Sequence, residues 1–134
     1  MFYVGRPRQG PAQQWAEEYA RRIGRFCEFR LQAVRSEQAL PAGARSFRVL
    51  LDPAGRHLSS TELAAVIEKV ENGAVKELQF VVGGVDGFSE PVRQEADLLM
   101  ALSRLTLSHE LARVAAAEQI YRAFTILRNH PYPR

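Results

Sequence analysis

The chain reads LQFVVGGVDG over residues 78–87, where a short apolar run leads directly into three glycines within five residues. The apolar run predicts a buried strand. Glycines at a strand exit let the backbone approach a ligand closely and present amide N–H groups to it. The loop is not a Walker loop, because no Lys-Ser/Thr follows, and its glycine spacing differs from that of the dinucleotide-binding fingerprint. A tight turn capped by Asp86 accounts for the loop at least as well as a ligand site does.

Strand-like and helix-like segments alternate on both sides of this loop. Apolar runs and period-two patterns predict strands at residues 2–4, 27–33, 47–52, 78–82 and 103–107. Helical periodicity predicts helices at about residues 12–24, 59–73, 89–100 and 110–127, and residues 36–45 are expected to form a loop or a single poor helical turn. The alternation indicates an α/β fold: a mostly parallel five-stranded sheet with helices on both faces and ligand sites at the carboxyl ends of its strands.

Length and composition predict one domain spanning residues 1–134. The chain has 134 residues, of which 46% are hydrophobic and 25% charged, outside the signature of disordered chains. A single cysteine, Cys27, cannot form an internal disulfide, which fits a reducing, cytoplasmic compartment. No segment has the length and apolarity of a signal peptide or a membrane span, so we expect no membrane partner.

The net charge of +3 is unevenly distributed. Residues 1–48 carry nine arginines against four glutamates, whereas residues 49–134 carry nine basic against eleven acidic groups. Only Lys69 and Lys76 among the eighteen basic residues are lysines. Arginine suits bidentate phosphate contacts and stacking on bases, so an RNA-facing surface is one explanation. A preference for arginine codons in a GC-rich genome is an equally good one.

Hydrolytic and metal chemistry find little support in the sequence. No serine lies in a G-x-S-x-G elbow, and Cys27 is expected to lie within a strand as a small apolar residue. The histidines His57, His109 and His130 match no zinc-binding spacing, so no metal is expected.

The last predicted helix is apolar on more than one face. Such a helix needs two neighbours. One can be the sheet, and the other we expect to be a second subunit, in a homodimer.

From residue 80 onward the chain resembles the ribosomal RNA large-subunit methyltransferase H family, a compact branch of the SPOUT (α/β-knot) methyltransferases. The resemblance covers the last 55 residues strongly, the chain from about residue 47 fairly, and the earlier part faintly. It is carried by VVGGVDGFS at residues 81–89, LSRLTLSH at 102–109, EQIYRAF at 118–124 and NHPY at 129–132, with LDPAG at 51–55 similar to an earlier loop of the family.

This resemblance implies a homodimeric enzyme that uses S-adenosylmethionine to methylate N3 of a pseudouridine in the 23S RNA of the large ribosomal subunit. It also implies a trefoil knot in the C-terminal half. Carried over by position, the cofactor pocket consists of Leu51, Gly84, Ser103, Arg104, Leu105, Thr106, Leu107 and Ser108. The residues expected at the RNA-facing mouth and assigned to catalysis are Arg122, Tyr132 and Arg134. Tyr121 and His130 also fall near that mouth, although for Tyr121 ordinary core packing is an equally good explanation.

Two departures from the family pattern bear on the substrate. The family tail has a histidine where this chain has Pro133, so the role of proton acceptor cannot be carried over. Residues 35–46 are shorter than the family's basic segment. Two alternatives therefore stay open: a ribosome- or RNA-binding protein that has lost catalysis, and a SPOUT methyltransferase that acts on a different RNA.

Overall fold

The computed structural model describes residues 1–43 and 45–132. Its centre is a five-stranded sheet in the order β2-β1-β4-β3-β5, with every neighbouring pair of strands parallel. The strands are β1 (Phe2–Val4), β2 (Gln32–Val34), β3 (Ser46–His57), β4 (Glu77–Val82) and β5 (Leu98–Ala101). The predicted parallel α/β sheet of five strands is confirmed.

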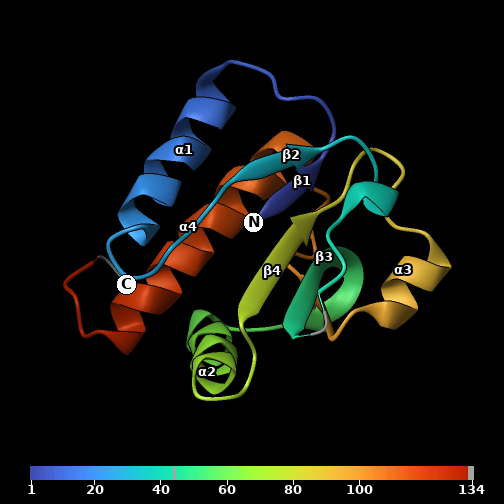
Figure 1. Cartoon of the computed structure of the whole chain (residues 1–134). Coiled ribbons are helices and arrows are strands. Elements are labelled where there is room, and N and C mark those ends of the chain that lie inside the picture. Colours follow the sequence, from blue (N-terminus) through green and yellow to red (C-terminus); the bar gives the residue numbers. More distant parts are fainter. Residues whose placement is uncertain (44, 133–134) are drawn as a thin grey trace.

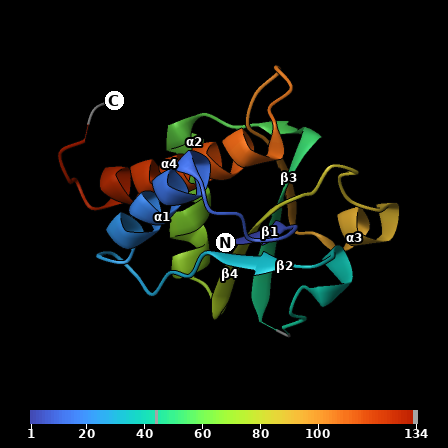
Figure 2. The same ribbon diagram turned by 90° about the horizontal axis from the view of Figure 1, so that it is seen from above.

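Helices cover both faces of the sheet, as predicted (Figures 1 and 2). Three of them lie on one face: α1 (Pro11–Ile23), α2 (Ser60–Glu71) and α4 (His109–Leu127). The other face carries only two short elements, the 3-10 turn η1 (Glu37–Ala39) and α3 (Glu90–Glu95).

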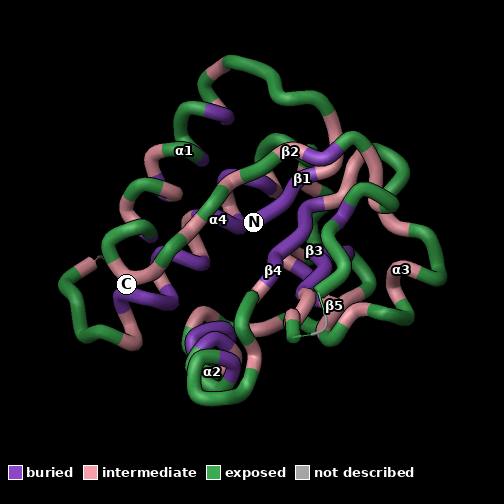
Figure 3. The backbone as a smooth tube through the Cα atoms, in the orientation of Figure 1, coloured by how far each residue is buried: buried purple, intermediate pink, exposed green. Residues whose placement is uncertain are grey.

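Side chains alternate between two hydrophobic cores along the central strands. Val49 and Leu51 of β3 and Phe80 and Val82 of β4 belong to the larger core beneath α1, α2 and α4. Leu50 and Val81 point the opposite way into a smaller core. Continuous apolar strands of this kind are expected in a parallel sheet that is buried on both faces. Figure 3 shows buried residues along the central strands and also on α2 and α4.

Helix α2 begins as its sequence predicts. The Ser59 hydroxyl accepts a hydrogen bond from the Glu62 amide at 3.1 Å, and the Glu62 carboxylate accepts one from the Ser59 amide at 2.9 Å. This reciprocal capping box satisfies two amide groups that would otherwise lack a partner within the helix.

Strand β3 is longer than predicted and leaves its ladder once. Both Leu51 and Arg56 are in register with Met100 of β5, and residues 52–55 between them loop out of the sheet. This excursion follows directly from the central part of β3. It places residues 52–55 at the carboxyl edge of the sheet.

The predicted strand at 27–33 is wrong for most of its length. The ladder between β2 and β1 begins only at Gln32, which pairs with Phe2, the first residue of β1. Residues before Gln32 have no strand to pair with. Cys27, Phe29 and Leu31 pack against the larger core instead, which explains their alternating pattern without a strand.

Two further boundaries are wrong near the carboxyl end. The helix predicted at 89–100 ends at Glu95, and the Ser89 side chain makes no capping hydrogen bond. Residues 98–101 form β5, because this apolar run pairs with β3 at the edge of the sheet. The strand predicted at 103–107 is a loop that follows β5.

Both α1 and α2 pack along α4 within one chain. Most of the apolar surface of α4 is therefore covered within one chain, whereas Leu111 in its first turn is 55% exposed. The homodimer stays a prediction.

Candidate functional site

A cavity of about 400 Å³ opens at the carboxyl ends of the central strands. The excursion within β3, the segments that follow β4 and β5, and the first turn of α4 form its walls. All eight residues predicted to bind the cofactor line this one cavity: Leu51, Gly84, Ser103, Arg104, Leu105, Thr106, Leu107 and Ser108. Segments that lie up to 57 residues apart in the chain thus meet where the sequence analysis expects a ligand.

Asp52 organises the wall contributed by β3. Its carboxylate accepts a hydrogen bond from the Ala54 amide at 2.8 Å, which holds the excursion of residues 52–55 in a tight turn. The same carboxylate lies 3.5 Å from the Arg93 guanidinium of α3. Asp52 is buried, so this partner and this amide compensate for the removal of its charge from water.

The glycine loop after β4 is a tight turn that also borders the cavity. The Gly87 amide donates to the Gly84 carbonyl at 3.1 Å, and Gly87 has a φ of +68°, which favours glycine. Val85 at the tip is 88% exposed. A Cβ atom on Gly84 would lie 3.5 Å from Val4 of β1, so the loop rests against the end of the neighbouring strand. The two interpretations of this loop, a turn and a ligand wall, are therefore compatible.

The loop of residues 102–108 is held by its own serines. The Ser103 hydroxyl accepts from the Leu105 amide at 2.9 Å, and the Ser108 hydroxyl caps α4 by accepting from the Leu111 amide at 3.2 Å. Both hydroxyls thus accept hydrogen bonds from backbone amides nearby in the chain. They shape the wall and leave backbone groups of the loop to face a ligand. Leu105 between them is 77% exposed.

The chemistry of the cavity suits a small molecule that is largely uncharged. Its volume falls in the usual range for ligand pockets. Leu51, Val82, Leu102 and Leu107 supply apolar walls, and Asp52 supplies a carboxylate. Such a site binds an apolar ring by contact and an amphipathic chain by backbone hydrogen bonds.

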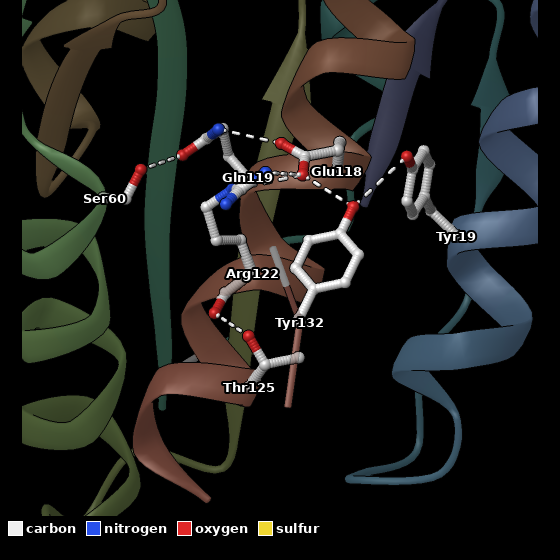
Figure 4. Close-up of polar contacts among 7 residues, drawn as sticks. All are labelled: Tyr19, Ser60, Glu118, Gln119, Arg122, Thr125 and Tyr132. Atoms are coloured by element: carbon white, nitrogen blue, oxygen red, sulfur yellow. Dashed lines mark hydrogen bonds and ion pairs between the residues drawn. The ribbon is translucent and has the colours of Figure 1, made fainter. Parts of the chain in front are cut away.

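Arg122 and Tyr132 meet in a second place, on the side of α4 that faces α1 (Figure 4). The Tyr132 hydroxyl donates to the Glu118 carboxylate at 2.9 Å, and the Arg122 guanidinium donates to the same carboxylate at 2.8 Å. The guanidinium carbon of Arg122 lies 4.8 Å from the centre of the Tyr132 ring. The hydroxyl of Tyr19 in α1 lies 3.4 Å from that of Tyr132.

The environment of Tyr132 keeps its phenol protonated. Burial is the largest cause of a raised pKa for this hydroxyl, followed by its hydrogen bonds with Tyr19 and Glu118. Tyr121 packs against Tyr132, with the two ring centres 4.7 Å apart in an edge-on arrangement. Tyr121 is itself buried in the larger core, which confirms the packing role considered for it.

Within one chain this cluster is separate from the cavity. Ala112 is the last residue of α4 in the cavity wall, and Arg122 follows ten residues later, roughly 15 Å along the helix axis. Neither Arg122 nor Tyr132 lines the cavity. Arg134 and Pro133 lie outside the described residues.

Several residues of the cavity wall were missed by the sequence analysis. Asp52 and Pro53 belong to a strand-exit loop whose pattern was noted, and an Asp-Pro pair directly after an apolar run was the available signal. His109 and Ala112 come from the start of α4. Nothing in their local sequence indicates that this helix begins against the strand exits.

A larger cavity of about 610 Å³ lies at the opposite edge of the sheet. Cys27 and residues of α2 and β4 line it. The strand-exit loops lie elsewhere, so we assign the candidate site to the smaller cavity. In the described part of the chain, no three His, Cys, Asp or Glu side chains gather as a metal site, and no helix is long and apolar enough to span a membrane.

Known proteins are similar to this chain along nearly its whole length. A family described as predicted SPOUT methyltransferase matches residues 1–133. A Thermus thermophilus protein is 46% identical over 132 residues, which cover 98% of this chain and 94% of the relative. A Solibacter usitatus protein is 40% identical over 136 residues, covering 100% and 97%, and a Geobacter sulfurreducens protein is 37% identical over 147 residues, covering 98% and 96%. All three relatives carry the name ribosomal RNA large subunit methyltransferase H.

Proposed function

The chain belongs to the SPOUT methyltransferase family, and from this premise we propose that it transfers a methyl group from S-adenosylmethionine to N3 of a pseudouridine in the 23S RNA of the large ribosomal subunit. One observation carries the proposal. The eight residues that the resemblance assigns to the donor line a single cavity at the strand exits. A trefoil knot in the C-terminal half, which the family implies, is part of the same proposal.

The cavity fits the donor in size and in chemistry. The adenine ring is uncharged and can pack against Leu51, Leu102 and Leu107, while loop amides and carbonyls can meet its polar edge. The turn at Gly84 has no side chain to occupy the space. Asp52 shapes the wall contributed by β3, and its carboxylate is already paired with Arg93 and the Ala54 amide.

The donor, when bound, supplies a methyl group on a positively charged sulfur. In the transfer the sulfur–methyl bond breaks, a bond from N3 to the methyl carbon forms, and a proton leaves N3. The chain contributes mainly alignment and the exclusion of water, which lower the barrier without covalent help from a side chain. Residues 103–108 form the wall that holds the donor in one orientation.

Arg122 and Tyr132 are proposed to position the RNA. A guanidinium binds phosphate or a base edge, and an aromatic ring stacks on a base. The Tyr132 hydroxyl is protonated near neutral pH, as an ordinary phenol is, and its raised pKa moves it further from accepting the N3 proton. Arg134 is part of this proposal by resemblance alone.

We also propose that the enzyme is a homodimer in the cytoplasm, where the ribosome is. The distance between the cavity and the Arg122–Tyr132 cluster supports the dimer, because a second copy can bring its own cluster to this cavity. Sedimentation should give a mass of about 30 kDa, twice that of the 15.1 kDa chain. A mass near that of one chain at micromolar concentration would contradict the dimer.

The test of the function compares ribosomal RNA from a strain with the gene and a strain without it. Mass spectrometry of the modified nucleosides should show N3-methylpseudouridine only when the gene is present. Persistence of the methylated nucleoside without the gene would refute the activity. Calorimetric binding of S-adenosylmethionine without any change in that nucleotide would point to a different RNA substrate.

A further inference from the structure

We propose that Arg6, Arg8, Arg35 and Arg104 form a phosphate-binding row that holds the RNA across the mouth of the cavity. The inference rests on the proposed function and adds to it the residues that contact the RNA backbone. It also gives a role to three of the nine arginines of residues 1–48.

Strand pairing brings the N-terminal arginines of this row together. Val4 of β1 and Val34 of β2 are in register, and the Gly5 amide donates to the Val34 carbonyl at 2.8 Å. Arg6 and Arg35 therefore leave two adjacent parallel strands at the same level. Arg8 follows in the loop between β1 and α1.

The same edge of the sheet carries the cavity. Val4 touches the glycine loop, since a Cβ on Gly84 would lie 3.5 Å from both its side chain and its carbonyl oxygen. Arg104 lines the cavity on the far side, after β5. In the strand order β2-β1-β4-β3-β5, the arginines thus flank the cavity on both sides. Four strand spacings of about 4.8 Å separate β2 from β5, a width of roughly 19 Å that several phosphates of a single strand can span.

These four arginines are exposed and have no acidic partner. Within residues 1–43 and 45–132, no carboxylate oxygen lies within 4.0 Å of any of the four guanidinium groups. Some arginines elsewhere on the surface are paired: Arg21 and Arg22 with Glu18, Arg30 with Glu28, and Arg128 with Glu71. Arg25, Arg45 and Arg56 are exposed and, among the described residues, form no ion pair either, so the row is distinguished by its place beside the cavity.

Carboxylates at this edge are mostly engaged. Asp52 is buried against Arg93, and Glu37 accepts a hydrogen bond from the Ser89 amide at 3.0 Å. Asp86 at the tip of the glycine loop is exposed, and so is Glu110 in the first turn of α4, between the cavity-lining residues His109 and Ala112. A line of unpaired guanidinium groups is the arrangement that a polyanion neutralises, with release of its counterions. RNA is the polyanion that a base-modifying site at this mouth requires.

The experiment uses the full chain and a triple variant, Arg6→Gln with Arg8→Gln and Arg35→Gln. Arg104 is left intact because it lines the cavity. The matched control is Arg25→Gln, which removes an exposed arginine just after α1 that forms no ion pair among the described residues. Methylation of large ribosomal subunits should show a KM at least about tenfold higher in the triple variant, with kcat and the calorimetric Kd for S-adenosylmethionine unchanged.

Salt dependence provides a second readout that a folding defect would not mimic. For a mixed-sequence single-stranded RNA, the slope of log Kd against log salt should fall by about 2 in the triple variant, since each phosphate contact contributes about 0.7. The control should keep the wild-type slope. An unchanged KM and an unchanged slope in the triple variant would refute the proposal that these arginines bind RNA phosphates.

The two proposals fail in different ways. If the wild-type chain does not methylate ribosomal subunits but binds single-stranded RNA through these arginines, the row stands and the substrate assignment fails. If the wild-type chain binds no RNA, or binds only vesicles of anionic lipid, the row itself is refuted.

Discussion

Replacing Gly55 by alanine should damage both the fold and the candidate site through one contact. Gly55 lies at the end of the excursion in β3, beside the backbone of β5. A Cβ atom there would stand 2.6 Å from the carbonyl carbon of Leu99 and from the amide nitrogen of Met100. These are backbone atoms of the neighbouring strand, so no side-chain rotation can relieve the overlap.

The size of the effect follows from the displacement that is required. Ordinary contact begins at 3.4 Å, so β3 and β5 must move apart by about 0.8 Å. The pairing of Arg56 with Met100 and of His57 with Ala101 lies directly beyond Gly55 and would weaken. Overpacking costs about 1–3 kcal/mol and a backbone hydrogen bond contributes about 1 kcal/mol. We therefore expect a loss of roughly 2–4 kcal/mol in the free energy of unfolding.

Urea unfolding followed by circular dichroism measures this loss. Gly73→Ala is the matched control, because a Cβ on Gly73 would meet its nearest atom, the Lys69 carbonyl oxygen, at 3.4 Å. The control should stay within about 0.5 kcal/mol of the wild type. Gly55→Ala should also weaken binding of S-adenosylmethionine, because β5 leads directly into residues 102–108 of the cavity wall. Equal stability of the two variants, with wild-type donor affinity in both, would refute this reasoning.

Three further substitutions test separate parts of the structure. Gly84→Val should abolish calorimetric binding of S-adenosylmethionine, since valine's methyl groups extend beyond the Cβ position that already touches Val4; unchanged affinity would remove Gly84 from the site. Ser59→Ala should cost about 1 kcal/mol in urea unfolding and leave donor binding intact. Hydrogen bonds from Ser59 also hold the pKa of Glu62 below its ordinary value. The wild type therefore loses stability as the pH falls below about 4.5, and the variant should lose less. Unfolding measured over a series of acidic pH values would detect this difference. Tyr132→Phe should reduce the loss of stability that the wild type shows as the pH rises above 10. In that range the unfolded chain releases a phenolic proton that folded Tyr132 retains. An identical dependence of stability on alkaline pH in the variant would contradict the raised pKa.

The parts of the fold with strong local signals could be predicted from the sequence. The capping box at Ser59 fixed the start of α2, and the apolar run at 78–82 matched β4 to within one residue. The order of strands and helices then placed the glycine loop and residues 51–55 at one edge. Parallel strands share a direction, so their exits gather together whatever the order of the strands.

The errors arise where a partner decides the conformation. An apolar run such as 98–101 is compatible with a helix or a strand, and it becomes β5 because β3 offers an open edge. The alternation at 27–33 reflects one buried face, yet β1 is too short to pair with all of it. The apolar faces of α4 require packing partners, and α1 and α2 pack against this helix within the same chain.

The position of β5 at the margin of the sheet has a consequence for motion. Among the described strands its only neighbour is β3, and the loop that follows it forms one side of the cavity. Local opening of a protein begins where lateral support is least, so the amides of β5 should exchange with solvent faster than those of β4. A ligand that contacts both sides of the cavity would link β5 to the central strands and slow this exchange. The hydrogen-exchange rate of the β5 amides therefore reports whether the cavity is occupied.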